Sequence, residues 1–475
     1  MENFVKLEHL LAEYARTGRY AFHMPGHKRQ PIPGCGWLPL AEDITEIAGF
    51  DNLHAPEGIL KEEMAAAASL FGAESTFFSV NGSTGAVLAA VSAAVPKGGT
   101  LLLERGSHIS VYHAAELRDL RLVFIRNGLP YAEQIRKAQA DAVILTSPSY
   151  EGCMKDVRGW VEAAHACGIP LLADEAHGAH LMADPYFPES AVSAGADLVV
   201  QSLHKTLPAM TQTALLHNVT GRIGDDALRH FLDVYETSSP SYVLMASVTA
   251  CLHFLQDEGK EAFSSYIKRL RRLREELSGL TQLHLAGGAE GILASDSELP
   301  PYRKGTRLDP GKLVITAKGR GALLDRLLRE RYHLEMEMKA PDYVLAMTSV
   351  FDTEEGFARL LSALRELDAD GRFAEDCPDA AGAGGDAMRQ LYEGPWPEAY
   401  MSVSEAVERK HVRLPLSEAA GRVSGGYLCL YPPDLPLILP GEVISPEIAK
   451  SVREYQKNGF TVTGVVDEFV EIVYY

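Results

Sequence analysis

The sequence has few cysteines and no long apolar run. Its six cysteines are scattered over 475 residues without a C-x-x-C pair, which argues against a disulfide framework and a zinc ribbon. No apolar stretch approaches the roughly 20 residues of a membrane span, and the first residues lack the basic region and apolar core of a signal peptide. We therefore expect a cytoplasmic protein with reduced thiols and no membrane contact.

Basic residues are also scarce relative to acidic ones. The chain has 45 Lys and Arg against 64 Asp and Glu, a formal net charge of −19. This balance argues against binding to the phosphate backbone of nucleic acid. It suits a small cationic substrate, although the same charge is also a common means of staying soluble. The length predicts two or three domains.

Short apolar runs alternate with Ala-rich segments of helical period from about Leu70 to Leu216. This alternation predicts an α/β fold with βαβ units and a mostly parallel sheet. Because open α/β sheets bind ligands at the carboxyl ends of their strands, functional residues should follow the runs directly. The runs expected to be strands are 76–80, 142–146, 170–173 and 198–201.

The rest of the chain divides into further units. A charged segment with Leu at helical spacing, 261–278, predicts a long solvated connecting helix. Two apolar runs (312–316 and 343–347) around a helical stretch (322–331) predict a smaller α/β unit, and a Gly- and Asp-rich stretch predicts an exposed linker. A Pro-rich run, 431–442, fits neither a regular helix nor a central strand. The expected units are an N-terminal segment (1–50), a large domain (51–275), a small α/β domain (276–375), a linker (376–395) and a C-terminal α+β domain (396–475).

The segment Asn81-Gly82-Ser83-Thr84-Gly85 follows the first strand-like run and opens an Ala- and Val-rich helix. Free backbone N–H groups, two hydroxyls and a flexible glycine backbone can together hold one phosphate. The spacings of a nucleotide P-loop and of a dinucleotide fingerprint are both absent. Taken alone, the segment also fits an ordinary helix N-cap and turn.

An acid and a lysine stand at the ends of two other strand-like runs. Asp174 opens the sequence Asp-Glu-Ala-His-Gly-Ala-His, where a carboxylate could keep the pyridine nitrogen of pyridoxal-5′-phosphate (PLP) protonated. Lys205, in Ser-Leu-His-Lys-Thr, could form an imine if its pKa were lowered in a partly desolvated pocket. The alternatives are a capped loop, a metal site built on His177 and His180 without a recognisable third ligand, and a solvated lysine. We expect no metal.

His108 follows a further apolar run, Leu101-Leu102-Leu103. An imidazole at a strand end can stack on a pyridinium ring or donate a proton, and it can equally be a loop histidine bonded to water. The combination of anion site, acid, lysine and histidine favours a PLP enzyme more than any single motif does.

These motifs, with several others, resemble the Orn/Lys/Arg decarboxylase family of PLP enzymes, almost from end to end. The resemblance implies PLP fold type I, the aspartate aminotransferase fold, with a seven-stranded sheet in the large domain. It also indicates a compact, arginine-decarboxylase-like member. The further matching segments are Phe22 to Lys28 (FHMPGHK), Asp43 to Glu46 (DITE), Asp51 to Gly58 (DNLHAPEG), Ser238 to Tyr242 (SSPSY) and Tyr431 to Glu442 (YPPDLPLILPGE).

The resemblance also implies roles for individual residues. Lys205 would hold PLP as a Schiff base, Asp174 would pair with the pyridine nitrogen, His108 would stack on the ring and Ala176 would support its other face. His177 would lie near the phenolic oxygen of PLP or the substrate carboxylate. Lys205, His108, Asp174 and His177 are thus the expected catalytic residues. The phosphate would be bound by Gly82, Ser83, Thr84, Ser202 and His204, joined by Ser238 or Ser239 of a neighbouring subunit in a homodimer or higher homo-oligomer with shared sites.

The implied reaction is decarboxylation of a basic L-amino acid, arginine before lysine or ornithine, to CO₂ and an amine that serves polyamine synthesis. Two departures from the family pattern bear on the substrate: Ile109 stands where Lys is common, and Gly425-Gly426 where Ala-Glu is common. The chain begins close to its His-Met-Pro-Gly-His motif, so we expect no receiver-like N-terminal domain. The alternatives are transamination, an aldol or elimination reaction on the same fold, and a PLP-binding relative without turnover.

Overall fold

A computed structural model describes residues 6–17, 19–299, 302–374, 394–431 and 434–474. The chain is built around a seven-stranded sheet of order β1-β7-β6-β5-β4-β2-β3. All neighbours from β6 to β3 are parallel, whereas β7 is antiparallel to both of its neighbours, which confirms the expected mostly parallel sheet of PLP fold type I. The strands are β1 (Ser75–Ser79), β2 (Thr100–Leu103), β3 (Arg121–Phe124), β4 (Ala142–Thr146), β5 (Leu171–Asp174), β6 (Leu198–Ser202) and β7 (Ala214–Asn218).

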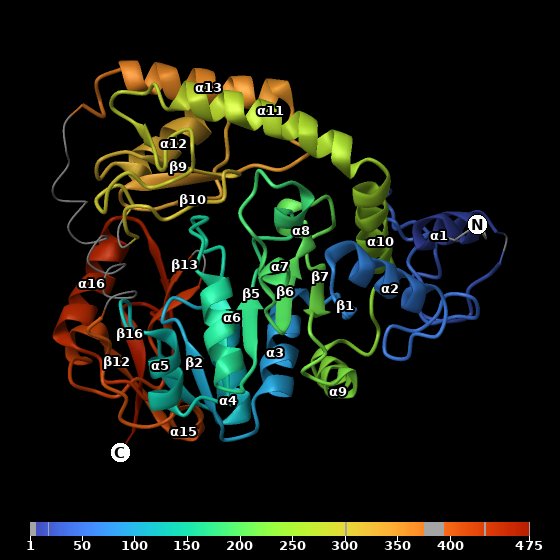
Figure 1. Cartoon of the computed structure of the whole chain (residues 1–475), viewed down its shortest axis with the longest axis horizontal. Helices are drawn as coiled ribbons and strands as arrows, with labels where there is room; N and C mark the ends of the chain where they lie inside the picture. Colours follow the sequence, from blue (N-terminus) through green and yellow to red (C-terminus); the bar gives the residue numbers. More distant parts are fainter. Residues whose placement is uncertain (1–5, 18, 300–301, 375–393, 432–433, 475) are drawn as a thin grey trace.

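The four predicted strands of this sheet all form, each within one residue of its expected bounds. They are continuous apolar runs because helices cover both faces of the sheet, so that nearly every side chain of β2, β4, β5 and β6 is buried. The covering helices, seen in Figure 1, are α2 (Ile59–Phe71), α3 (Gly82–Ala94), α4 (Ile109–Arg118), α5 (Tyr131–Ala138), α6 (Val157–Ala166), α7 (Ala191–Ala194) and α9 (Asp225–Tyr235). The short helix α8 (Leu203–Thr206) directly follows β6 at the end of the sheet.

Helix α3 is almost wholly enclosed. Its alanines Ala86, Ala89 and Ala90 are at most 2% exposed, and it packs on α4, α9 and the sheet. Small side chains allow this close approach on several sides, because a helix that is apolar all round can be buried in a core. The sequence around Gly82 therefore begins a helix whose first turn lies at the end of β1.

Two long helices connect the large sheet to a smaller one. Helix α10 (Tyr242–Asp257) leads into α11 (Gly259–Leu277), which agrees with the helix predicted at 261–278 and also buries one face through Phe263 and Leu270. The second sheet is antiparallel, with the order β10-β11-β9-β8. Its elements are β8 (His284–Leu285), β9 (Lys312–Thr316), α12 (Gly321–Tyr332), β10 (Met338–Lys339), β11 (Tyr343–Met347) and α13 (Glu354–Ala369). In Figure 1 this unit lies above the large sheet.

The C-terminal residues form two small antiparallel sheets with helices, an α+β arrangement as expected. Pro436 lies in β14, an edge strand, which is where a sheet tolerates proline. The elements of this unit are α15 (Val403–Glu408), β12 (His411–Pro415), β13 (Leu428–Tyr431), β14 (Leu435–Ile438), α16 (Pro446–Lys457), β15 (Thr461–Thr463) and β16 (Phe469–Val473). At the other end of the chain, the N-terminal segment forms one helix, α1 (Leu7–Arg16). Most of the predicted linker, 376–395, lies outside the described residues.

None of the described helices is both long enough and apolar enough to cross a membrane.

Candidate active site

The carboxyl ends of β4, β5 and β6 and the first turn of α3 meet at a cavity of about 330 Å³. The parallel register brings these ends together, since Thr146 pairs with Asp174 and Asp174 with Val200. Six of the predicted residues line the cavity: Ser83, His108, Asp174, Ala176, His177 and Lys205. A larger hollow of about 1000 Å³ beside β8 includes none of the predicted site residues.

Lys205 lies on α8, three residues after the end of β6. Its Nζ is 3.2 Å from Nε2 of His177. Burial lowers the pKa of Lys205, while the negative charges of Asp174 and Glu337 oppose this shift. A larger neutral fraction of the amine follows, and the neutral amine is the nucleophilic form.

Asp174 is the last residue of β5 and is only 5% exposed. One carboxylate oxygen, Oδ1, accepts a hydrogen bond from the backbone N–H of Ala176 at 3.2 Å. This bond holds the side chain at the strand end, where its charge acts on both Lys205 and His108. The site therefore contains a buried carboxylate beside an amine of lowered pKa.

His108 is the N-cap of α4. Its Nδ1 accepts a hydrogen bond from the backbone N–H of Ser110 at 3.2 Å and lies 2.8 Å from the Ser110 hydroxyl. Burial lowers the pKa of His108, and the charge of Asp174 opposes that shift. The cap fixes the ring orientation, and the lowered pKa favours a neutral imidazole.

Part of the predicted phosphate site lies against the cavity and part does not. Ser83 lines it at the first turn of α3, whereas Gly82, Thr84, Ser202 and His204 do not. Ser202 is nevertheless fully buried, and among the described residues its Oγ has no hydrogen-bond partner. His204 instead pairs through Nδ1 with the carbonyl of Thr213 at 2.9 Å.

Ser238 and Ser239 are exposed and lie outside the cavity of the single chain. The structure thus brings the amine, the acid, both histidines and Ser83 together, but not these two serines.

The cavity also contains residues that the sequence did not single out: Glu104, Lys155, Tyr150, Glu337 and Asp434. Tyr150 follows β4, so its position at a strand end was a usable signal. Glu337 comes from the small unit and belongs to none of the matching segments. Asp434 comes from the C-terminal unit and lies within the matching segment 431–442, but no role was assigned to it. In addition, Lys312 reaches the far side of His177 from β9, with 2.8 Å between Nζ and Nδ1.

Comparisons with known families agree with this geometry. Residues 6–290 match the family model "Orn/Lys/Arg decarboxylase, major domain", and residues 386–458 match "Orn/Lys/Arg decarboxylase, C-terminal domain". The chain belongs to the Orn/Lys/Arg decarboxylase family. This family consists of PLP-dependent amino-acid decarboxylases, so the expected enzyme class is confirmed.

Individual relatives differ in their named substrate. The chain is 29% identical to the arginine decarboxylase of Bacillus subtilis, over 98% of this chain and 96% of that protein. It is 23% identical to the constitutive lysine decarboxylase of Escherichia coli, over 92% of this chain and 75% of that protein. The crystal structure of the Francisella novicida lysine decarboxylase superposes with a TM-score of 0.84 at 19% identity, covering 99% of this chain and 82% of that one, a likeness of fold.

The residues of the cavity fit the cofactor of this decarboxylase family. Ser83, in the first turn of a buried helix, offers donors to a phosphate from the cavity wall. Ser202 lies outside the lining, but its buried hydroxyl has no partner among the described residues and could also donate. The amine of Lys205 and the carboxylate of Asp174 border the same cavity.

Proposed function

We propose that the protein decarboxylates a basic L-amino acid, arginine in preference to lysine or ornithine, with PLP bound covalently to Lys205. The observation that carries the proposal is the meeting of Lys205, Asp174 and His108 at one cavity. These are the amine, the acid and the ring that a PLP decarboxylase needs.

Each proposed cofactor contact has a chemical reason. Lys205 would bind the aldehyde through its Nζ, and Asp174 would accept a hydrogen bond from the protonated pyridine nitrogen. His108 and Ala176 would enclose the ring, and the first turn of α3 with Ser202 would bind the phosphate. When bound, PLP supplies an electron sink for the electron pair that remains at Cα after CO₂ departs.

The residues of the chain would direct that chemistry. A cavity that holds the substrate carboxylate perpendicular to the cofactor plane selects decarboxylation over transamination. Lys205 Nζ, or a histidine nitrogen beside it, would return a proton to Cα. His177 is the nearest such histidine, because its Nε2 is 3.2 Å from Nζ of Lys205.

A cationic substrate fits the charges of the cavity wall. Glu337 and Asp434 both line the cavity. Glu337 accepts a hydrogen bond from the Tyr150 hydroxyl, and neither carboxylate forms an ion pair within the part of the chain that the structure describes. Asp434 has a backbone φ of +71°, a conformation that costs energy in a residue with a Cβ and is more frequent at functional sites. We assign these two carboxylates to the distal cation of the substrate; Glu104, by contrast, already pairs with Lys155 at 2.7 Å.

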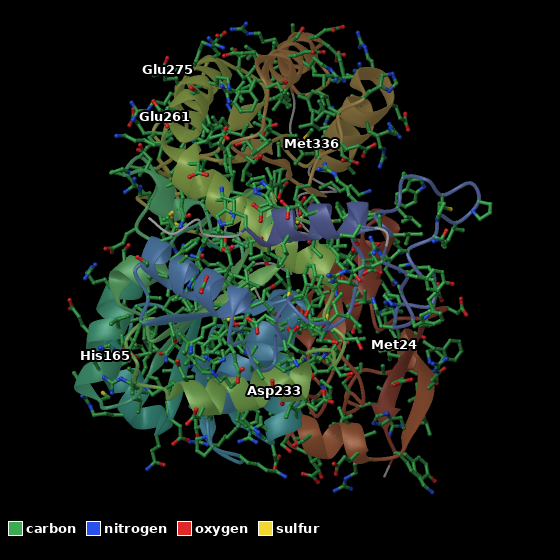
Figure 2. All side chains as sticks on the ribbon, turned by 90° about the vertical axis from the view of Figure 1, so that its right-hand side faces the viewer. Met24, His165, Asp233, Glu261, Glu275 and Met336 are labelled. Atoms are coloured by element: carbon green, nitrogen blue, oxygen red, sulfur yellow. The ribbon has the colours of Figure 1, made fainter. Side chains whose placement is uncertain are left out.

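We also propose that the active form is a homodimer or larger homo-oligomer. Large apolar side chains of the N-terminal segment are strongly exposed, including Phe22 at 90% and Trp37 at 79%. Figure 2 shows Met24, 62% exposed, in the loops at the edge of the molecule. Surfaces of this kind are usually covered in an assembly. The exposed Ser238 and Ser239 would then face the phosphate site of a second copy.

One experiment tests the reaction. The PLP-loaded protein is incubated with arginine, lysine, ornithine and non-basic amino acids, and CO₂ and amine are measured. We expect release with arginine above lysine and ornithine. If no basic amino acid releases CO₂ while PLP stays covalently bound, the decarboxylase assignment is wrong and the cofactor assignment survives.

A further inference from the structure

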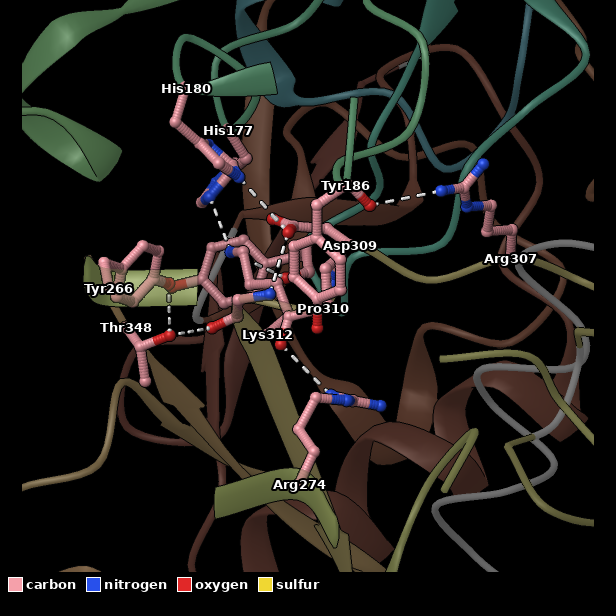
Figure 3. A network of polar contacts seen from close by, with 12 residues as sticks. His177, His180, Tyr186, Tyr266, Arg274, Arg307, Asp309, Pro310, Lys312 and Thr348 are labelled. Carbon is pink, nitrogen blue, oxygen red and sulfur yellow. Dashed lines mark hydrogen bonds and ion pairs between the residues drawn. The ribbon is translucent and has the colours of Figure 1, made fainter. Parts of the chain in front are cut away.

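A second buried lysine lies behind the candidate catalytic residues. Lys312, the first residue of β9, is 1% exposed and extends from the small unit to the edge of the large sheet. Its Nζ is 2.8 Å from Nδ1 of His177 and donates a hydrogen bond to the carbonyl of Tyr150 at 3.1 Å. On the other side of the same imidazole, Nε2 is 3.2 Å from Nζ of Lys205. His177 therefore lies between two amines, and Figure 3 shows its contact with Lys312.

The backbone around Lys312 leaves the side chain little freedom. A Cβ on Gly152, whose φ is +95°, would lie 2.7 Å from Cγ of Lys312. Gly152 in turn accepts a hydrogen bond from the backbone N–H of Asp309 at 2.7 Å, and Asp309 pairs with His180 at 3.2 Å. These contacts fasten the 309–312 segment to the loop after β4, so the amine has a defined position.

Burying an ammonium in this position is costly, and an apolar side chain of the same length would avoid the cost. Burial lowers the pKa of Lys312 to about 8, with the charge of Asp309 opposing the shift, so at neutral pH the amine is mainly protonated. Burial and the two neighbouring lysines hold the pKa of His177 well below its usual range, so this imidazole is neutral.

The donors and acceptors of Lys312 and His177 then determine which ring nitrogen of His177 carries the proton. An ammonium has donors only, whereas a neutral imidazole has one donor nitrogen and one acceptor nitrogen. If Lys312 donates to Nδ1, the single ring proton of His177 must be on Nε2. That nitrogen lies 3.2 Å from Nζ of Lys205, which can accept the bond in its unprotonated form.

We propose that Lys312 is a positioning residue that fixes His177 as the Nε2–H tautomer and directs that N–H toward the amine of Lys205. The significance of this N–H for the reaction rests on the proposed function. His177 would keep a donor pointed at Nζ of Lys205, the atom that would hold the cofactor. The tautomer itself is a property of the cofactor-free chain.

The test reads the tautomer directly. The cofactor-free protein is labelled with ¹⁵N-histidine, and the two ring nitrogens of His177 are observed by NMR, identified by their loss in His177→Gln. We expect a protonated Nε2 and an unprotonated Nδ1 at pH 7. A proton on Nδ1 in the unaltered chain overturns the proposal, whether or not any variant folds.

Two variants then isolate the amine. Lys312→Met keeps the length of the side chain but removes its donors, and we expect the Nδ1–H tautomer to become populated. Lys268→Met, at an exposed lysine of α11, is the matched control and should leave the signals unchanged. An unaltered tautomer in a folded Lys312→Met protein would overturn the proposal.

Kinetics give a second reading in the PLP-loaded enzyme. At metal sites, loss of the partner that orients a ligating histidine typically costs about 10- to 100-fold. By the same reasoning we expect Lys312→Met to lower kcat about 10-fold or more while KM changes less. A variant with unchanged kcat would overturn the role in the reaction. If no amino acid is decarboxylated by the unaltered enzyme, the proposed function fails, and the NMR measurement still decides the tautomer.

Discussion

Arg105 and Glu442 form a bidentate ion pair, with Nη1–Oε1 at 2.6 Å and Nη2–Oε2 at 2.7 Å. Both residues are buried, at 2% and 3% exposure. Arg105 stands three residues before His108, and Glu442 ends the Pro-rich run of the C-terminal unit. The pair therefore joins that unit to the loop that carries a candidate site residue. It also shows a structural role for the Pro-rich run, whose last residue anchors the C-terminal unit to this loop.

Glu442→Gln should lower the free energy of unfolding by about 3–5 kcal/mol, because it leaves the buried Arg105 guanidinium without a counter-charge. Chemical denaturation followed by fluorescence measures the change. Glu471→Gln provides the control, since Glu471 pairs with Arg413 at the exposed surface at 3.4 Å and its loss should cost about 1 kcal/mol or less. Equal losses in both variants would contradict the assignment of the buried pair.

Lys205→Ala should remove the covalent attachment of PLP and reduce decarboxylation to background. Borohydride reduction followed by mass spectrometry measures the attachment, because reduction makes an imine bond permanent. We expect the mass of the unaltered protein to increase by one reduced cofactor and that of Lys205→Ala to stay the same. Lys137→Ala, at a side chain that is 73% exposed, should behave like the unaltered protein. Retained labelling in Lys205→Ala would transfer the role to another lysine.

Asp174→Asn should lower kcat about 100-fold or more, because an amide cannot stabilise a protonated pyridine nitrogen as a carboxylate does. Steady-state kinetics with the preferred amino acid measure this loss. Asp226→Asn, an exposed acid in the first turn of α9, should keep full activity. A variant of Asp174 with normal kcat would remove this residue from the catalytic set.

Asp434→Asn should raise KM for arginine about 10-fold with a smaller change in kcat, since it removes a charge-assisted bond to the distal cation. Asp467→Asn is a close control, because Asp467 also has a positive φ, +51°, and is exposed in the same unit. Asn tolerates this conformation as Asp does, so backbone effects should be equal. The assignment fails if both variants change KM alike.

Glu175 should make the stability of the chain fall as pH rises. Burial raises the pKa of this carboxyl from 4.5 to about 8. Between these values the folded state retains a proton that the unfolded chain loses, so the free energy of unfolding decreases by at most about 1.4 kcal/mol per pH unit. Denaturation of the cofactor-free protein at pH 5.5 and 7.5 should show a smaller decrease for Glu175→Gln than for the unaltered chain. An equal decrease would mean that Glu175 ionises normally in the fold.

Many strands of the large domain and of the small α/β unit could be predicted from the sequence. The apolar runs at 142–146, 312–316 and 343–347 became strands with those bounds. Each run is recognised from adjacent residues alone, and in an α/β protein a short continuous apolar run typically forms a buried strand. The expected domain boundaries, the cytoplasmic location and the roles of individual site residues stay predictions.

Site residues at the ends of strands could be predicted in the same way, from the apolar runs that they end or follow. Asp174 ends β5 and Lys205 follows β6, and a parallel sheet brings such strand ends together. Lys312 and Asp434 could not be predicted in this way, because each belongs to another unit and only the packing of units brings it to the cavity. A lysine within a strand carries no local signal that distinguishes it from a surface charge.

The sequence by itself determined the family, the mostly parallel sheet and the strand-end positions of Lys205, Asp174 and His108. These features depend on local periodicity and on motifs of adjacent residues. Only the tertiary structure decided that Lys312 contacts His177, that Asp434 and Glu337 face the cavity and that Arg105 pairs with Glu442. Such contacts join residues more than a hundred positions apart, and they depend on how the units pack together, which no local pattern encodes.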